Sequence, residues 1–65
     1  MPWNESYYPP SMNNLPLRVR EKAIEIANAL LGQGSGEGKA IRVGIAQAKR
    51  WARAHSAAER GQPTR

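Results

Sequence analysis

Apolar residues recur at helical spacing in two stretches of this chain, and a glycine-rich segment separates them. In residues 15–31, an advance of about 100° per residue gathers one apolar stripe, with Ile24 and Leu31 at its edges. The stripe consists of Val19, Ala23, Ile26, Ala27 and Leu30. The opposite side is polar, so we expect it to face solvent: Glu21, Lys22, Glu25 and Asn28. This pattern predicts an amphipathic helix with one buried face.

The second stretch predicts a helix over residues 37–54, and its apolar face is built largely from small residues. Ala40, Gly44 and Ala48 stand four apart at the centre of that face, and Trp51 closes its far end. The face also carries Ile41, Ile45 and Ala52. A glycine inside a helix costs about 1 kcal/mol relative to alanine. We therefore expect Gly44 to mark a close approach to another helix.

Residues 32–38 hold four glycines and predict a turn. We expect Gly32 to end the first helix in the left-handed conformation and Ser35 to cap the second. The spacing Gly34-x-Gly36-x-x-x-Ala40 resembles the helix-hairpin-helix module, whose glycine amides contact a DNA phosphate, although Ser35 stands where that family has an aliphatic residue. A flexible turn is the alternative. The phosphate-loop and dinucleotide-binding patterns both fail at required positions.

Proline and aromatic residues dominate the arm formed by residues 1–14, which cannot form a long helix. We expect it to fold back over the helices; the alternative is an arm that binds a partner. Residues 11–14 predict a single turn capped by Ser11. Asn13 or Asn14 is then expected to cap the first helix, with Pro16 in its first turn.

These elements predict an all-α fold: a two-helix hairpin with a short helical turn and an aromatic and proline-rich arm packed on it. Residues 1–55 form the single helical module, and residues 56–65 are expected to be a mostly disordered tail. A chain of 65 residues supports a core worth only a few kcal/mol after entropy is subtracted. The chain has no cysteine and one histidine, so disulfides and the common metal sites cannot stabilise it. We therefore expect self-association or very regular helix packing to supply the missing stability.

The basic residues and the aromatic residues suggest two candidate surfaces. The chain carries ten Lys and Arg against five Asp and Glu, a net +5 that attracts acidic partners. A basic band lies along the second helix and offers possible nucleic-acid contacts, although a solvated face is the alternative: Arg42, Lys49, Arg50 and Arg53. A possible interaction surface for a protein partner or a second copy comes from the aromatic residues: Trp3, Tyr7, Tyr8 and Trp51.

Catalytic chemistry has no support in the sequence. No candidate nucleophile has a general base at a spacing that indicates a nucleophile–base pair. The chain is also too short to enclose a pocket that excludes water. We expect no catalytic residues, cofactor or metal, and hence no enzyme. No apolar run reaches the roughly 18 residues of a membrane span. The first residues lack the basic start and the apolar run that are typical of a signal peptide. We therefore expect a cytoplasmic location.

Several segments together resemble a group of small uncharacterised bacterial proteins. They are Met1-Pro2-Trp3, Tyr8-Pro9-x-Ser11-Met12-x-Asn14-Leu15, Val19-Arg20-x-Lys22-Ala23-Ile24-x-Ile26-Ala27-Asn28-Ala29-Leu30, Glu37-Gly38-x-Ala40-Ile41 and Ala46-x-Ala48-Lys49-x-Trp51-Ala52. The start of the chain and its Leu15-Pro16 pair are also similar, more weakly, to ChaB-like proteins, which are described as regulators of cation transport. The resemblance implies a bacterial cytosolic protein and no known catalytic residues.

Two functions follow as hypotheses. The first is a non-catalytic protein-interaction or regulatory module, which binds a protein partner or a second copy. The second is a low-specificity nucleic-acid-binding protein that uses the basic band.

Overall fold

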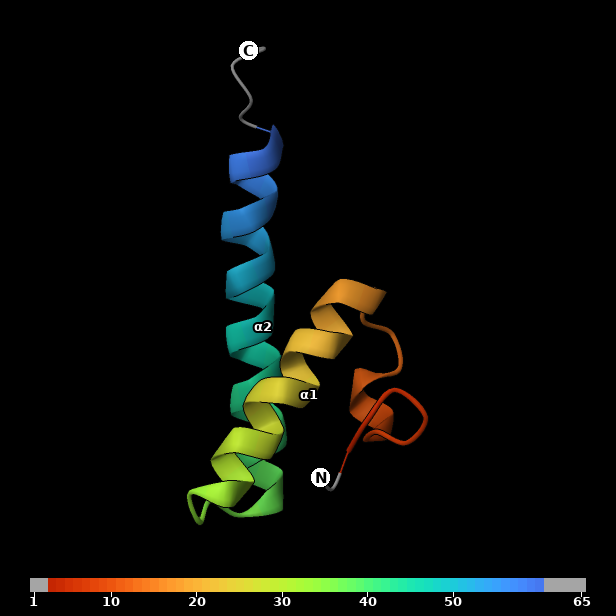
Figure 1. Ribbon diagram of the computed structural model, residues 1–65, viewed down its shortest axis with the longest axis vertical. Coiled ribbons are helices and arrows are strands. Elements are labelled where there is room, and N and C mark those ends of the chain that lie inside the picture. Colours follow the sequence, from red (N-terminus) through yellow and green to blue (C-terminus); the bar gives the residue numbers. More distant parts are fainter. Residues whose placement is uncertain (1–2, 61–65) are drawn as a thin grey trace.

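The computed structural model describes residues 3–60, with side chains through residue 55, and it confirms the all-α hairpin. A 3₁₀ turn, η1 (Pro10–Met12), precedes two α-helices, α1 (Leu17–Gly32) and α2 (Glu37–Arg60) (Figure 1). Within the described residues, extended pairing is limited to one isolated bridge between Asn4 and Tyr7. No described helix is long and apolar enough to cross a membrane.

The helices pack through the predicted small-residue face of α2. Ala40 and Ala48 are fully buried, and Gly44 lies between them against α1. A Cβ atom on Gly44 would stand 2.9 Å from the carbonyl oxygen of Ala23 and 3.2 Å from the Cβ of Ala27. The predicted close approach is therefore confirmed, and it explains a glycine that weakens the helix by itself.

The first helix begins later than the sequence suggests. Pro16 is extended, with φ −57° and ψ 154°, and it occupies the N-cap position instead of the first turn. No side chain caps the helix, so the prediction of an asparagine cap is wrong. The reason is steric, because a residue that precedes proline, here Leu15, is pushed out of the helical region. The predicted single turn exists as η1, with Pro9 and not Ser11 at its N-cap.

The turn between the helices takes its left-handed residue two positions after Gly32. Gly32 is the last residue of α1, and Gly34 has φ 97°. The amide of Gly34 donates to the carbonyl of Leu31, and the amide of Ser35 donates to that of Leu30, both at 3.0 Å. These two bonds form a Schellman motif, which satisfies the last carbonyls of α1. The prediction that Ser35 caps the second helix is wrong, because Gly36 immediately precedes α2 and its carbonyl accepts the amide of Ala40.

The second helix is longer than predicted. It continues through Arg60, whereas we expected it to end near residue 54 and a disordered tail to begin at 56. Residues 57 and 58 are alanines, the strongest helix formers, and the next glycine comes only at position 61. The rest of the predicted tail, residues 61–65, lies outside the described residues. The end of α2 extends beyond α1 and the arm (Figure 1).

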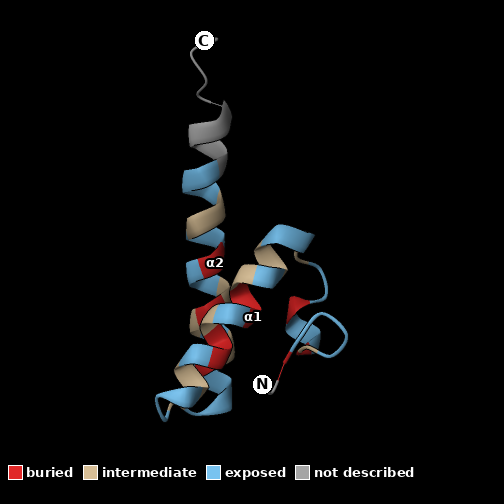
Figure 2. Cartoon of the chain, in the orientation of Figure 1, coloured by how far each residue is buried: buried red, intermediate tan, exposed pale blue. Residues whose placement is uncertain are grey.

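The arm folds back on the helices, as predicted. Trp3 is 7% exposed and Met12 is fully buried, and both belong to the same core as the α1–α2 contact. Buried residues gather where the two helices cross and along the arm (Figure 2). The arm therefore supplies part of the core that two short helices lack.

Asn28 holds the arm in place, and its expected position on the solvated side of α1 is wrong. The residue is 8% exposed. Its Oδ1 accepts a hydrogen bond from the backbone amide of Trp3 at 3.3 Å, and its Nδ2 donates to the Trp3 carbonyl at 3.0 Å. A buried amide side chain is tolerated because both of its polar ends are paired.

Candidate functional site

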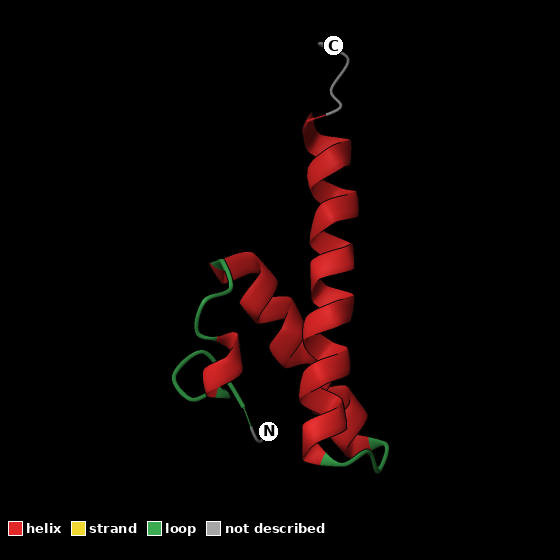
Figure 3. Ribbon diagram, turned by 180° about the vertical axis from the view of Figure 1, so that it is seen from behind, coloured by secondary structure: helices red, strands yellow, loops and turns green. Residues whose placement is uncertain are grey.

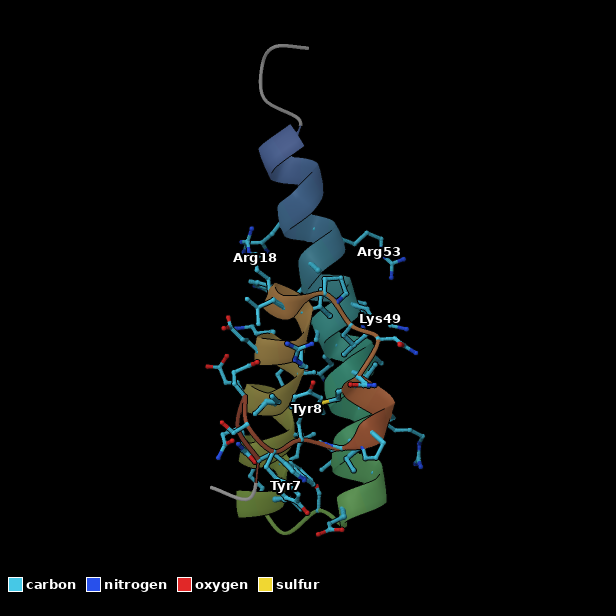
Figure 4. The ribbon with its side chains drawn as sticks, turned by 90° about the vertical axis from the view of Figure 1, so that its right-hand side faces the viewer. Tyr7, Tyr8, Arg18, Lys49 and Arg53 are labelled. Atoms are coloured by element: carbon cyan, nitrogen blue, oxygen red, sulfur yellow. The ribbon has the colours of Figure 1, made fainter. Side chains whose placement is uncertain are left out.

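The basic band lies on the outer side of α2, because the small-residue face turns that side away from α1. Arg42, Lys49, Arg50 and Arg53 are all exposed. Three of them, at positions 42, 49 and 53, fall within about 20° of one line along the helix. Lys49 and Arg53 extend to the same side of α2 (Figure 4). The structure thus brings the four predicted cations together.

No acidic side chain among the described residues pairs with this band. The ion pairs lie on α1 and the arm instead: Arg20 contacts Glu5 at 3.4 Å, and Lys22 contacts Glu25 at 3.2 Å. Viewed from behind, α2 lies in front of α1 (Figure 3). The cations therefore face solvent with their charge uncompensated by the described part of the chain.

Two further residues belong to this surface and were missed in the sequence. Lys39 is exposed in the first turn of α2, and Ala46 is exposed between the cations. On a helical projection, Lys39 and Arg50 lie about 60–80° around the helix from Arg42, with Ala46 midway. The same projection of the sequence could have found both. We call these six residues the outer face of α2: Lys39, Arg42, Ala46, Lys49, Arg50 and Arg53.

The four aromatic residues do not form one interaction surface, so that prediction is corrected. Trp3 is buried in the core, because the arm covers the open side of the helices. Tyr8 is half-buried, with the Arg20 guanidinium 4.8 Å from its ring centroid. Tyr7 alone of the four is well exposed, at 68%.

Trp51 lies at a separate, shallow cleft between α1 and α2. The cleft measures about 200 Å³ and is also lined by Arg18, Glu21, Lys22 and Glu25. The Lys22 ammonium and the Arg18 guanidinium lie 5.2 Å and 5.8 Å from the indole centroid. The ring of His55 lies 4.6 Å from it, centroid to centroid, and its Nδ1 is 2.9 Å from the Trp51 carbonyl oxygen. Cations and an imidazole thus already surround this ring.

Tyr7 is held in a rigid turn. Its amide and carbonyl exchange hydrogen bonds with those of Asn4, and the Asn4 side chain accepts bonds from the amides of Ser6 and Tyr7 at 2.7 and 2.9 Å. Glu5 of the same turn reaches Arg20 on α1. The exposed phenol ring is therefore presented by a preorganised backbone, apart from the outer face of α2 (Figure 4).

In the glycine-rich turn, the amides of Gly34 and Ser35 are already hydrogen-bonded, so these two are not free for a helix-hairpin-helix contact. The Gly34 and Ser35 amides bond the end of α1, and the Gly36 carbonyl accepts the amide of Ala40 at 2.9 Å. Within the described residues, no three histidine, aspartate or glutamate side chains gather as a metal site. The basic band remains the feature with the clearest chemistry.

Comparison with known proteins finds a bacterial relative. The chain is 50% identical over 52 residues to the uncharacterized protein YdaT of Bacillus subtilis (strain 168). The match covers 80% of this chain and 35% of YdaT, so the chain spans about a third of the length of this curated relative. No family model matches the chain, and no solved structure matches it. The resemblance to uncharacterised bacterial proteins is thereby supported, and the similarity to ChaB-like proteins stays a prediction.

Proposed function

We propose that this chain is a non-catalytic interaction module that binds an acidic partner through the outer face of α2. The supporting observation is that the basic band is exposed and has no acidic neighbour among the described residues. A set of like charges gathered on one face attracts an oppositely charged surface and accelerates encounter with it.

The primary candidate partner is a protein with an acidic surface, which makes the chain an interaction or regulatory module. The outer face is unsuited to pairing with a second copy of itself, because five cations would then oppose five cations. Self-association through another surface, such as the turn that presents Tyr7, is compatible with the proposal. A small domain with one charged face is typical of an adaptor, which binds a partner and does not catalyse a reaction.

Low-specificity binding of nucleic acid is the second candidate. The residue at the centre of the outer face is Ala46, and the face carries no large apolar side chain. Protein interfaces draw most of their energy from buried aromatic and arginine anchors that fill pockets. This face has arginines but no aromatic anchor, and lysines and arginines are also the side chains that contact phosphates.

The non-catalytic part of the proposal is supported by the surroundings of the carboxylates. Glu21 and Glu25 line the open cleft at Trp51, and Glu25 is paired with the Lys22 ammonium. Solvent access weakens the electrostatic stabilisation on which general acid–base catalysis depends.

A capture experiment from bacterial cytosol tests the proposal. Tagged wild-type chain is compared with the double charge reversal Arg42→Glu/Arg53→Glu, in extract with and without nuclease. We expect wild type, and not the reversal, to retain a discrete partner that is released by high salt. Arg42→Lys/Arg53→Lys keeps the charge and is the matched control, so it should behave as wild type. Equal retention by wild type and the reversal would contradict the proposal.

Sedimentation velocity tests the self-association that is compatible with this scheme. A concentration-dependent dimer that persists in the Arg42→Glu/Arg53→Glu variant would place the self-contact away from the outer face of α2. A dimer abolished by Tyr7→Ala would locate it at the turn that presents this tyrosine.

A further inference from the structure

The cations on the outer face of α2 form two lines with a small residue between them. Arg42, Lys49 and Arg53 make one line, and Lys39 and Arg50 make the other, about 60–80° around the helix. Ala46 lies midway between the lines and is exposed. The outer face is therefore low at its centre, where the short Ala46 side chain lies, and positively charged along its two edges. This arrangement fits a partner with two parallel rows of negative charge.

α1 does not cover the outer face of α2. It packs on the small-residue face of the helix, and the arm lies alongside the two helices (Figures 1 and 3). The two lines run from Lys39 to Arg53, which spans about 21 Å along the helix axis at 1.5 Å per residue. That length corresponds to about six base pairs of a nucleic-acid duplex at 3.4 Å each.

The aromatic residues favour a duplex over a single strand. Proteins that bind single strands without sequence preference stack the bases on exposed aromatic rings beside a basic groove. Here Trp3 is buried, and Trp51 is flanked by His55, Arg18 and Lys22. Tyr7 is exposed but lies apart from Lys49 and Arg53 (Figure 4). The outer face itself therefore offers cations but no stacking platform.

Groove dimensions favour DNA over RNA. An α-helix with its side chains is about 10–12 Å across, and the major groove of B-form DNA is about 12 Å wide. The major groove of A-form RNA is deep and narrow and does not admit side chains for readout. We propose that α2 lies in the major groove of duplex DNA, with Ala46 toward the groove floor and the two lines of cations on the phosphates of opposite strands. The proposal rests on the nucleic-acid candidate above.

Binding of this kind is weak, tolerant of sequence and steeply dependent on salt. The outer face offers only lysines and arginines around an alanine, and phosphates accept contacts from such side chains in every sequence. Five phosphate contacts predict a slope of about −4.5 in log K against log salt, which is a loss of about 500-fold between about 50 and 200 mM salt. The dissociation constant at physiological salt should fall in the range of about 10⁻⁴ to 10⁻⁶ M that is typical of non-specific binding.

Fluorescence anisotropy with labelled oligonucleotides tests the proposal directly. The probes are duplex DNA of two unrelated sequences, the matching single strands and the matching duplex RNA, each titrated over a range of salt. We expect duplex DNA to bind at least about tenfold more tightly than the single strand or duplex RNA, with little difference between the two sequences. Methyl green, which occupies the major groove, should compete, and netropsin, which occupies the minor groove, should not.

Single substitutions test whether both lines make contact. Arg42→Gln and Arg53→Gln in one line, and Lys39→Gln and Arg50→Gln in the other, should each lower the salt slope by about one. Adding Glu21→Gln to Arg53→Gln restores the net charge at a distance from the outer face and should not restore binding. Far-UV circular dichroism confirms that each variant keeps its helices.

Several results would overturn the inference. These are tighter binding to the single strand, equal binding to duplex RNA, competition by netropsin, or a slope that responds to one line of cations only. Absence of binding to every probe at low salt would remove the nucleic-acid candidate as well. The proposed interaction function would then rest on the capture of a nuclease-resistant protein partner, which that experiment measures independently.

Discussion

At the scale of single residues, Asn28 is the most informative side chain of the molecule. It lies on α1 among glutamates and a lysine, yet it is buried and pairs with both backbone groups of Trp3. Its amide therefore recognises the main chain of the arm and not the indole side chain. A substitution here should release the start of the arm, at Trp3, and leave α1 and α2 in place.

We predict that Asn28→Ala destabilises the protein by about 1–3 kcal/mol, because it leaves the buried amide and carbonyl of Trp3 unpaired. Chemical denaturation measures this loss. In a Trp51→Phe background, the fluorescence of Trp3 should also move to longer wavelength. Asn13→Ala is the matched control, since Asn13 is exposed and accepts only a long bond of 3.4 Å from the Tyr8 hydroxyl in the described structure. Equal effects of the two substitutions would refute the role given to Asn28.

Periodicity explains why some residues could be assigned from the sequence and others could not. Ala40, Gly44 and Ala48 repeat every four residues, so their shared face and close packing followed directly. Asn28 could not be assigned in this way, because its burial depends on a backbone partner 25 residues away. Trp3 was ambiguous for the same reason: an aromatic residue in an arm suits both a core and an exposed contact.

At the scale of elements, the contact between the helices depends on the absence of one side chain. We predict that Gly44→Ala destabilises the fold by about 1–3 kcal/mol, although alanine favours a helix, because its Cβ would stand 2.9 Å from a backbone oxygen of α1. Thermal unfolding provides the measurement. Gly38→Ala is the control, since nothing lies within 4 Å of its added Cβ, and it should be neutral or stabilising by up to about 1 kcal/mol. A stabilising Gly44→Ala would show that the helices can move apart at little cost.

The turn between the helices gives a second prediction at this scale. Gly34→Ala should cost about 1–2 kcal/mol, since φ 97° strains a residue that carries a Cβ. Gly32→Ala should not be destabilising, because Gly32 is helical and has open space around it. Urea denaturation of the two variants separates these positions. The reverse order would mean that the left-handed residue is Gly32, as the sequence alone suggested.

Element boundaries were the least predictable part of the fold. The start of α1 depends on Pro16 and on the restriction it places on Leu15, which outweighed the capping preference of the asparagines. The end of α2 depends on helix propensity beyond the contact with α1, where no apolar periodicity remains to be seen. The prediction of the basic band was not affected by these two changes in helix boundaries, because its residues lie well inside α2.

At the scale of the whole molecule, stability is concentrated in very few large side chains. Met12 is the largest fully buried one among the described residues, and it comes from the arm instead of a main helix. We predict that Met12→Ala costs about 2–5 kcal/mol. Because a chain of this size has a net stability of only a few kcal/mol, the variant should be largely unfolded at room temperature.

Near-ultraviolet circular dichroism and thermal melting measure this effect. Leu17→Ala is the control, since Leu17 is 54% exposed and its truncation should change stability by less than about 0.5 kcal/mol. A cooperative melt of Met12→Ala close to that of wild type would show that the helix pair is stable without the arm.

The contact between Asn28 and Trp3 also has a consequence in time. The two helices are joined by four residues, so their contacts are local and form early in folding, whereas the arm must close a loop of 25 residues. The start of the arm, at Trp3, is therefore the last segment to dock and the first to open. Each molecule should pass repeatedly through a state in which the helix pair and Met12 are still packed while Trp3 is released. The amide hydrogen of Trp3 should accordingly exchange with solvent sooner than those at the centre of α1.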